Sequence, residues 1–194
     1  VNMVRYHGSI NPAGKGTKIT DVDTTEIQKM WRYVAAMKKE GIYSTISPFW
    51  AHNGHMGGWV PEEWGIEGYS GKDPLWAVMY FNDKLKDAYK VWVKELYTKT
   101  NPYTGIPLRE DPAVAIIQIK NEDGVFFWTM QNIKPELKAL ISAQFFEWVV
   151  EKYGSVIAAY QKWDGLRLPN DQSGRFELFN TWQMTIDLPA DSAL

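Results

Sequence analysis

The chain has 194 residues, of which 45% are hydrophobic and 23% charged, and these ordinary values exclude an intrinsically disordered protein. The 21 Lys and Arg residues nearly balance the 23 Asp and Glu residues, so the net charge of −2 argues against a nucleic-acid partner. The absence of Cys excludes disulfides, zinc–cysteine sites and thiol nucleophiles. No apolar run reaches the ~20 residues that cross a bilayer, so no membrane partner is predicted.

The N-terminal segment predicts a strand followed by a helix. The strand covers residues 1–7, and Arg5 and His7 share one of its faces because side chains two residues apart point the same way. After a loop, a helix is predicted over residues 23–41, with an acidic first turn and a closing glycine. Its apolar residues recur at helical spacing: Ile27, Met30, Trp31, Val34 and Met37.

A second strand is predicted over residues 42–50, which are rich in β-forming side chains. The following stretch, 51–73, is rich in glycine and shows little periodicity. An irregular loop of that length is uncommon in a compact domain and is usually functional. Helical patterning returns after Pro74, and residues 101–105 form a turn cluster.

The third predicted strand, residues 113–119, is the most apolar segment of the chain. A nearly continuous apolar run is typical of a strand that is buried on both faces of a parallel sheet. Helices are predicted over residues 135–153 and 155–163. Strands that alternate with helices indicate an α/β architecture with a parallel sheet.

Polar or aromatic side chains stand at the end of each predicted strand. They are Arg5 and His7 on the first, Trp50, His52 and Asn53 after the second, and Asn121, Glu122 and Asp123 after the third. Ligands of parallel α/β proteins bind beyond the carboxyl ends of the strands, so convergent ends would form one site. Glu122 is then a candidate general acid, and the alternative is a polar turn after a strand. Asp123 either shifts the pKa of Glu122 or caps the turn.

These residues resemble those of a known group, the clan A glycoside hydrolases of the cellulase-like type. Residues 115–122, Ala-Ile-Ile-Gln-Ile-Lys-Asn-Glu, are similar to the fourth strand of these (β/α)8 barrels, which ends in Asn-Glu. Further similar segments are residues 2–7 (second strand), 41–43 (start of the third strand) and 101–128 (a bacterial branch of the group). The resemblance covers most of residues 1–130.

The resemblance implies part of a (β/α)8 TIM barrel, an incomplete α/β catalytic domain over residues 1–194. It implies a retaining glycosidase that cleaves O-glycosidic bonds in a polysaccharide or oligosaccharide, with Glu122 as the acid/base. Such an enzyme would need no cofactor and no metal, and it would be secreted or periplasmic. Arg5, His7 and Asn121 would position the sugar and the nucleophile. The complete set of expected substrate contacts is Arg5, His7, Trp50, His52, Asn53, Trp59, Asn121 and Trp128.

Two departures from the group stand out. The second predicted strand ends in the apolar run Pro48-Phe49-Trp50, where the group often has a polar residue. The nucleophilic Glu of a seventh strand has no counterpart, and Glu177 lies where the group has a helix. Such a barrel typically has about 250 residues, so we expect either a fragment or completion by another copy or segment. The alternative function is a non-catalytic carbohydrate-binding fragment.

The remaining candidates are aromatic and histidine side chains, and the chain has ten Trp residues. Trp59 and Trp64, in the glycine-rich loop, are either a platform for sugar rings or anchors for the loop. Trp128 follows the Asn-Glu pair and is expected in the sugar cleft. His52 and His55 are surface or substrate-contact residues rather than half of a metal site, because no third ligand stands at coordination spacing.

Overall fold

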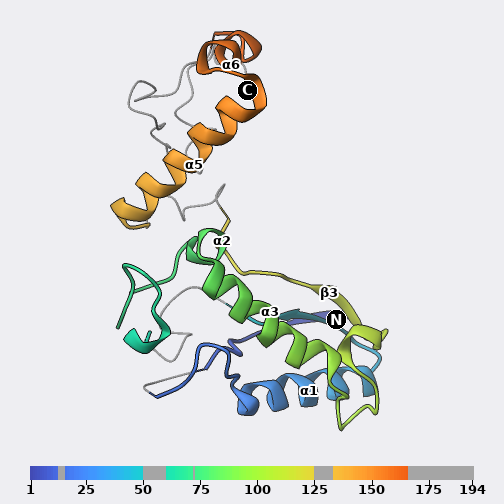
Figure 1. Ribbon diagram of the computed structural model, residues 1–194. Helices are drawn as coiled ribbons and strands as arrows, with labels where there is room; N and C mark the ends of the chain where they lie inside the picture. Colours follow the sequence, from blue (N-terminus) through green and yellow to red (C-terminus); the bar gives the residue numbers. More distant parts are fainter. Residues whose placement is uncertain (13–15, 50–59, 72, 125–132, 166–194) are drawn as a thin grey trace. The chain divides into compact units, whose positions relative to one another are not determined.

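The protein is described by a computed structural model that covers residues 1–12, 16–49, 60–71, 73–124 and 133–165 (Figure 1). The chain divides into two compact units, Val1–Asp123 and Gly124–Leu194. The first contains a parallel sheet with helices. The described part of the second is helical.

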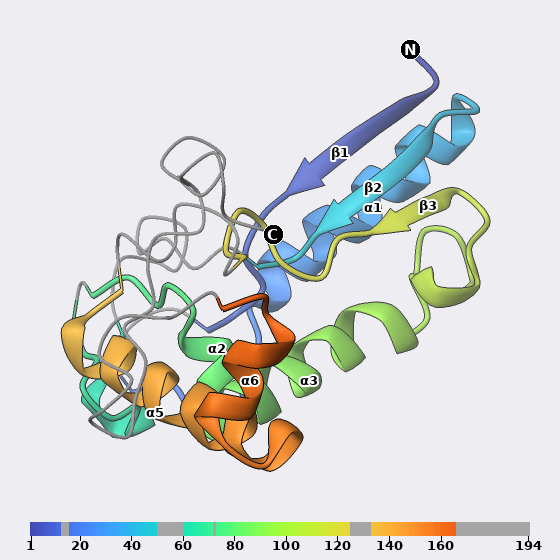
Figure 2. The same ribbon diagram turned by 90° about the horizontal axis from the view of Figure 1, so that it is seen from above.

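The sheet of the first unit consists of β1 (Met3–His7), β2 (Tyr43–Ser47) and β3 (Val114–Ile117), in the order β1-β2-β3. All neighbours are parallel, and the three arrows of Figure 2 point the same way. The β1–β2 register pairs Arg5 with Thr45 and His7 with Ser47. The three predicted strands and their parallel arrangement are therefore confirmed.

The two long helices of the first unit begin at side chains that cap them. The helices described in this unit are α1 (Thr24–Lys39), α2 (Val78–Phe81) and α3 (Asp83–Thr98), with short 3-10 turns at Glu62–Trp64 and Leu108–Glu110. The Asp23 carboxylate accepts a hydrogen bond from Glu26 N at 2.9 Å, and the Asn82 side chain accepts one from Leu85 N at 3.0 Å. Side chains at these caps satisfy backbone donors that the first helical turn leaves open.

The core of the first unit lies between the sheet and its helices. Helix α1 packs against β2, whose Ser44 and Ile46 are fully buried on one face. The apolar and aromatic side chains buried from α1 and α3 are Ile27, Met30, Trp31, Val34, Leu85, Ala88, Trp92, Leu96 and Tyr97. On α1, Ile27, Met30, Trp31 and Val34 confirm the predicted core face, because apolar residues at helical spacing gather on one side, whereas the predicted Met37 is only partly buried.

The second unit contains α5 (Pro135–Tyr153) and α6 (Val156–Lys162), close to the predicted bounds. Its small core is formed by Val149, Ala159 and Tyr160, with partly buried aromatic residues around it. Ser155 caps α6 by accepting a hydrogen bond from Ala158 N at 3.1 Å. No helix in the described part of either unit is long and apolar enough to cross a membrane.

The predicted burial of the third strand is wrong. Ile116 and Ile117 are 50% and 48% exposed, and Ile119, just beyond β3, is 70% exposed. β3 is the last strand in the sheet order, so nothing in the described residues pairs with its outer side. An apolar run shows that a strand can be buried, but its position in the sheet decides whether it is.

The predicted TIM-barrel fold is also contradicted. The described residues form a sheet of three parallel strands and five helices, a small α/β arrangement rather than a barrel. A barrel closes only when every strand has a neighbour on both sides. Within the described residues β1 and β3 each pair with β2 alone. The resemblance lies in local sequence segments within residues 1–130, and local sequence does not determine how many strands a sheet contains.

Candidate functional site

The carboxyl ends of the three strands remain side by side beyond the regular sheet. Backbone hydrogen bonds continue as Gly8 N to Ser47 O (3.0 Å), Ile10 N to Pro48 O (3.0 Å), Gln118 N to Ile46 O (2.9 Å) and Asn121 N to Phe49 O (3.4 Å). These bonds fix the chain at the edge where the sequence predicts a site. The polar side chains that follow each strand are brought to the same place for this reason.

A polar network joins the first and third strand ends. Arg5 Nη1 lies 3.4 Å from Asn121 Oδ1 and 3.4 Å from Gln118 Oε1, and Gln118 Nε2 lies 3.3 Å from Asn121 Oδ1. Asn121 is buried and Arg5 is exposed. The predicted convergence of Arg5 and Asn121 is thus observed. Gln118 was missed, although a polar residue inside an apolar strand is a usable signal.

His7 belongs to the same edge through a different contact. Its Nδ1 lies 2.9 Å from Ser47 Oγ, and the imidazole tautomer decides which of the two groups donates. Ser47 is fully buried at the end of β2 and pairs with His7 in the register. Sequence reasoning missed Ser47, since an isolated serine at a strand end carries no distinctive signal.

Glu122 is exposed at this edge, and its backbone is unusual. Its φ is +44°, in the left-handed region that costs a residue with a Cβ about 1–2 kcal/mol. The residues on either side, Asn121 and Asp123, are only 3% and 2% exposed. Strained backbone that persists at one exposed residue is a reason to suspect function there. The turn presents a single carboxylate to solvent between two buried polar residues.

Asp123 binds the backbone of a segment that lies 46 residues away in the sequence. Its Oδ1 accepts a hydrogen bond from Ala77 N at 2.8 Å, just before α2. Its carboxylate also forms an ion pair with the ammonium group of Lys120, and both side chains are buried. Burial lowers the pKa of Lys120, and the charge of Asp123 opposes that effect. Lys120 was not recognised from the sequence.

Two tyrosines complete the surroundings of this turn. Tyr89 Oη donates a hydrogen bond to Ile119 O, and burial raises the pKa of Tyr89. Burial, together with the charge of Asp123, also raises the pKa of Tyr80. Both phenols therefore stay neutral to a higher pH than an ordinary exposed tyrosine.

Several predicted contacts lie outside the described residues: Trp50, His52, Asn53, Trp59 and Trp128, together with His55 and Glu177. Trp64 is described, and it is a loop anchor rather than a sugar platform. It is 1% exposed, and its Nε1 donates to Thr17 O at 2.9 Å. Trp92 Nε1 binds Ile19 O of the same loop at 2.8 Å.

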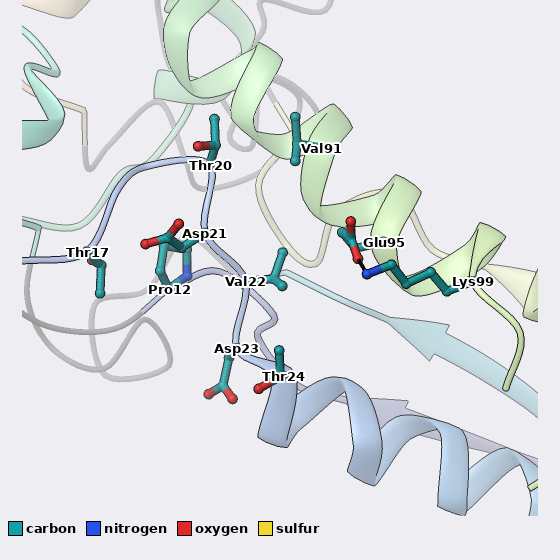
Figure 3. Close-up of a pocket in the computed structure, with 10 residues that line it drawn as sticks. All are labelled: Pro12, Thr17, Thr20, Asp21, Val22, Asp23, Thr24, Val91, Glu95 and Lys99. Atoms are coloured by element: carbon teal, nitrogen blue, oxygen red, sulfur yellow. Dashed lines mark ion pairs between the residues drawn. The ribbon is translucent and has the colours of Figure 1, made fainter. Parts of the chain in front are cut away.

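A separate cavity of about 670 Å³ lies between the loop that contains Thr17 and Asp21, the start of α1 and one side of α3 (Figure 3). Thr17, Asp21 and Asp23 line it from the loop, and the Glu95–Lys99 ion pair lines it from α3. None of the predicted site residues lines this cavity. The candidate site is therefore the strand edge around Glu122.

The described residues contain no group of three or more His, Asp or Glu side chains that could hold a metal ion. The chain matches no protein-family model, and a search of curated proteins found no match. The site offers an exposed carboxylate that can exchange a proton, with guanidinium and amide groups that can bind hydroxyl groups nearby.

Proposed function

We propose that the protein is a glycoside hydrolase in which Glu122 is the general acid/base. The observation that carries this proposal is the exposed Glu122 at a φ of +44°, next to an Asn121 held by Arg5. The resemblance of residues 101–128 to glycoside hydrolases supports it, since in that group an Asn-Glu pair ends a strand and the Glu is the acid/base. The proposal depends on this local geometry and not on a particular number of strands.

In the proposed reaction Glu122 donates its proton to the glycosidic oxygen while a second carboxylate attacks the anomeric carbon and the bond to the leaving sugar breaks. Glu122 then accepts a proton from the water that displaces this carboxylate from the anomeric carbon. Asn121 Oδ1 accepts from both Arg5 and Gln118, which orients the Asn121 amide. Its NH₂ group is then the part that can donate a hydrogen bond to a sugar hydroxyl.

A retaining mechanism also needs a second carboxylate about 5–5.5 Å from the first. Asp123 does not supply it, because its carboxylate is buried and engaged by Lys120 and by Ala77 N. This observation favours a second candidate function, a non-catalytic carbohydrate-binding protein that uses the same polar edge. In that case Arg5 and Asn121 would bind sugar hydroxyls and Glu122 would transfer no proton.

Glu122→Gln separates the two functions. For an enzyme we expect hydrolysis of phenyl β-cellobioside, which has a poor leaving group, to fall by at least about 100-fold. Hydrolysis of dinitrophenyl β-cellobioside should recover when azide is added, because azide attacks the glycosyl intermediate without a general base. Release of the phenols and of reducing sugar from a panel of β-glucans, xylans and mannans is the measurement.

The matched control is Glu67→Gln, which makes the same change of charge at another exposed glutamate. It should leave turnover unchanged. Equal turnover by Glu122→Gln and the wild-type chain would remove Glu122 from the mechanism. Binding of the same polysaccharides without release of reducing sugar would support the non-catalytic function.

A further inference from the structure

The turn that carries Glu122 is bracketed by a buried ion pair. Lys120 and Asp123 stand on either side of Asn121 and Glu122, and their side chains are only 3% and 0% exposed. A buried ion pair is weak evidence for stability, because desolvation of both charges offsets much of their attraction. Stability alone therefore does not explain an ion pair at this place. The pair spans Glu122, whose backbone is strained, and this suggests a role in holding that residue.

Each member of the pair is tied to a different element. Asp123 Oδ1 accepts the hydrogen bond from Ala77 N at 2.8 Å, and Ala77 itself has a φ of +60° at the start of α2. The Lys120 ammonium lies 4.5 Å from the centre of the Tyr80 ring of α2 and 5.8 Å from that of Phe49, two residues beyond β2. The pair thus links the Glu122 turn to α2 and to the segment that follows β2.

Left-handed backbone at a glutamate persists only where the surroundings over-determine it. The ion pair closes the turn across Glu122, while the bond from Tyr89 Oη to Ile119 O holds the chain before it. Asn121 is held independently by Arg5 and Gln118. The flanking residues are therefore fixed, and the Glu122 side chain itself remains exposed.

We infer that Lys120 and Asp123 are positioning residues, a buried clamp that keeps Glu122 in its left-handed conformation and aims its carboxylate at the substrate. The catalytic part of this inference rests on the proposed function. Neither residue reaches the reacting atoms in this assignment. Their effect is on the geometry of proton transfer, where a misplacement of about 1 Å can cost about 100-fold in rate.

The test uses Lys120→Met, Asp123→Asn and the double variant in the full chain. Lys38→Met is the matched control, because Lys38 also pairs with a fully buried aspartate, Asp111, at 3.0 Å, but on α1. Hydrogen exchange of the peptide covering residues 118–124 reports on the turn whether or not the protein is active. The kcat and KM for phenyl β-cellobioside report on catalysis, and the melting temperature reports on stability.

We expect faster exchange in the 118–124 peptide and a kcat lowered about 10- to 100-fold in both single variants, with KM unchanged. Lys38→Met should lower the melting temperature without either effect. The double variant should regain much of the melting temperature, because no buried charge is left unpaired. Its exchange should stay fast and its kcat low, since the clamp is absent.

A double variant with wild-type exchange and kcat would overturn the clamp, as would the same changes in Lys38→Met. A different pattern would overturn only the proposed function. If the clamp variants exchange faster but Glu122→Gln hydrolyses phenyl β-cellobioside like the wild-type chain, the clamp stands and Glu122 is not the acid/base.

Discussion

Glu122 combines a strained backbone with an exposed side chain. The strained backbone should lower the stability of the fold, whereas the side chain serves the proposed function. Glycine adopts positive φ without the clash of a Cβ atom. We expect Glu122→Gly to raise the free energy of unfolding by about 0.5–1 kcal/mol, the relief of strain less the added freedom of the unfolded chain. Denaturant unfolding measures this, and activity should be lost in the same variant.

Glu67→Gly is the control, since Glu67 is exposed and is not among the described residues with positive φ. There the same substitution should lower stability, because it adds only freedom to the unfolded chain. A loss of stability in Glu122→Gly would mean that the Glu122 side chain makes stabilising contacts that outweigh its backbone strain.

Among the elements, α1 depends on its cap. Asp23 accepts the Glu26 N–H at 2.9 Å, and this bond satisfies a donor that has no partner within the helix. Asp23→Ala should lower the free energy of unfolding by about 1 kcal/mol, while Asp23→Asn should retain most of it. Thermal or denaturant unfolding compares the two variants. Equal losses in both would assign the effect to the charge of Asp23 near the helix dipole instead.

For the molecule as a whole, the tyrosines should make stability depend on alkaline pH. Burial, followed by the hydrogen bond and charge of Glu26, raises the pKa of Tyr6 from 10.0 to about 12, and burial also raises the pKa of Tyr33, Tyr89 and Tyr97. Above pH 10 the unfolded chain loses phenolic protons that the folded chain keeps. The stabilisation is therefore complete below pH 10 and is lost as pH rises through 12.

The free energy of unfolding measured across this pH range should fall less steeply in Tyr6→Phe than in the wild-type chain. The phenylalanine cannot ionise but still packs against Tyr33, whose ring centre lies 4.9 Å from that of Tyr6. An unchanged slope in Tyr6→Phe would show that other groups govern alkaline unfolding.

Much of the candidate site followed from residue order alone. Parallel strands place their carboxyl ends at one edge, so the meeting of Arg5 with Asn121 was predictable before any distance was known. Gln118, Ser47 and Lys120 were not predicted, because their roles come from partners on other elements or from burial. That another copy or segment covers the exposed β3 remains a prediction.

The sequence by itself determined the local elements of this protein and their parallel α/β order. Helical spacing, caps such as Asp23 and runs of β-formers depend on residues only a few positions apart, so they can be read along the chain. The tertiary structure alone decided that Ile116 and Ile117 are half exposed, that Trp64 anchors a loop and that the sheet within the described residues is not closed. Burial and closure depend on contacts between residues far apart in the chain, and local pattern carries no information about them.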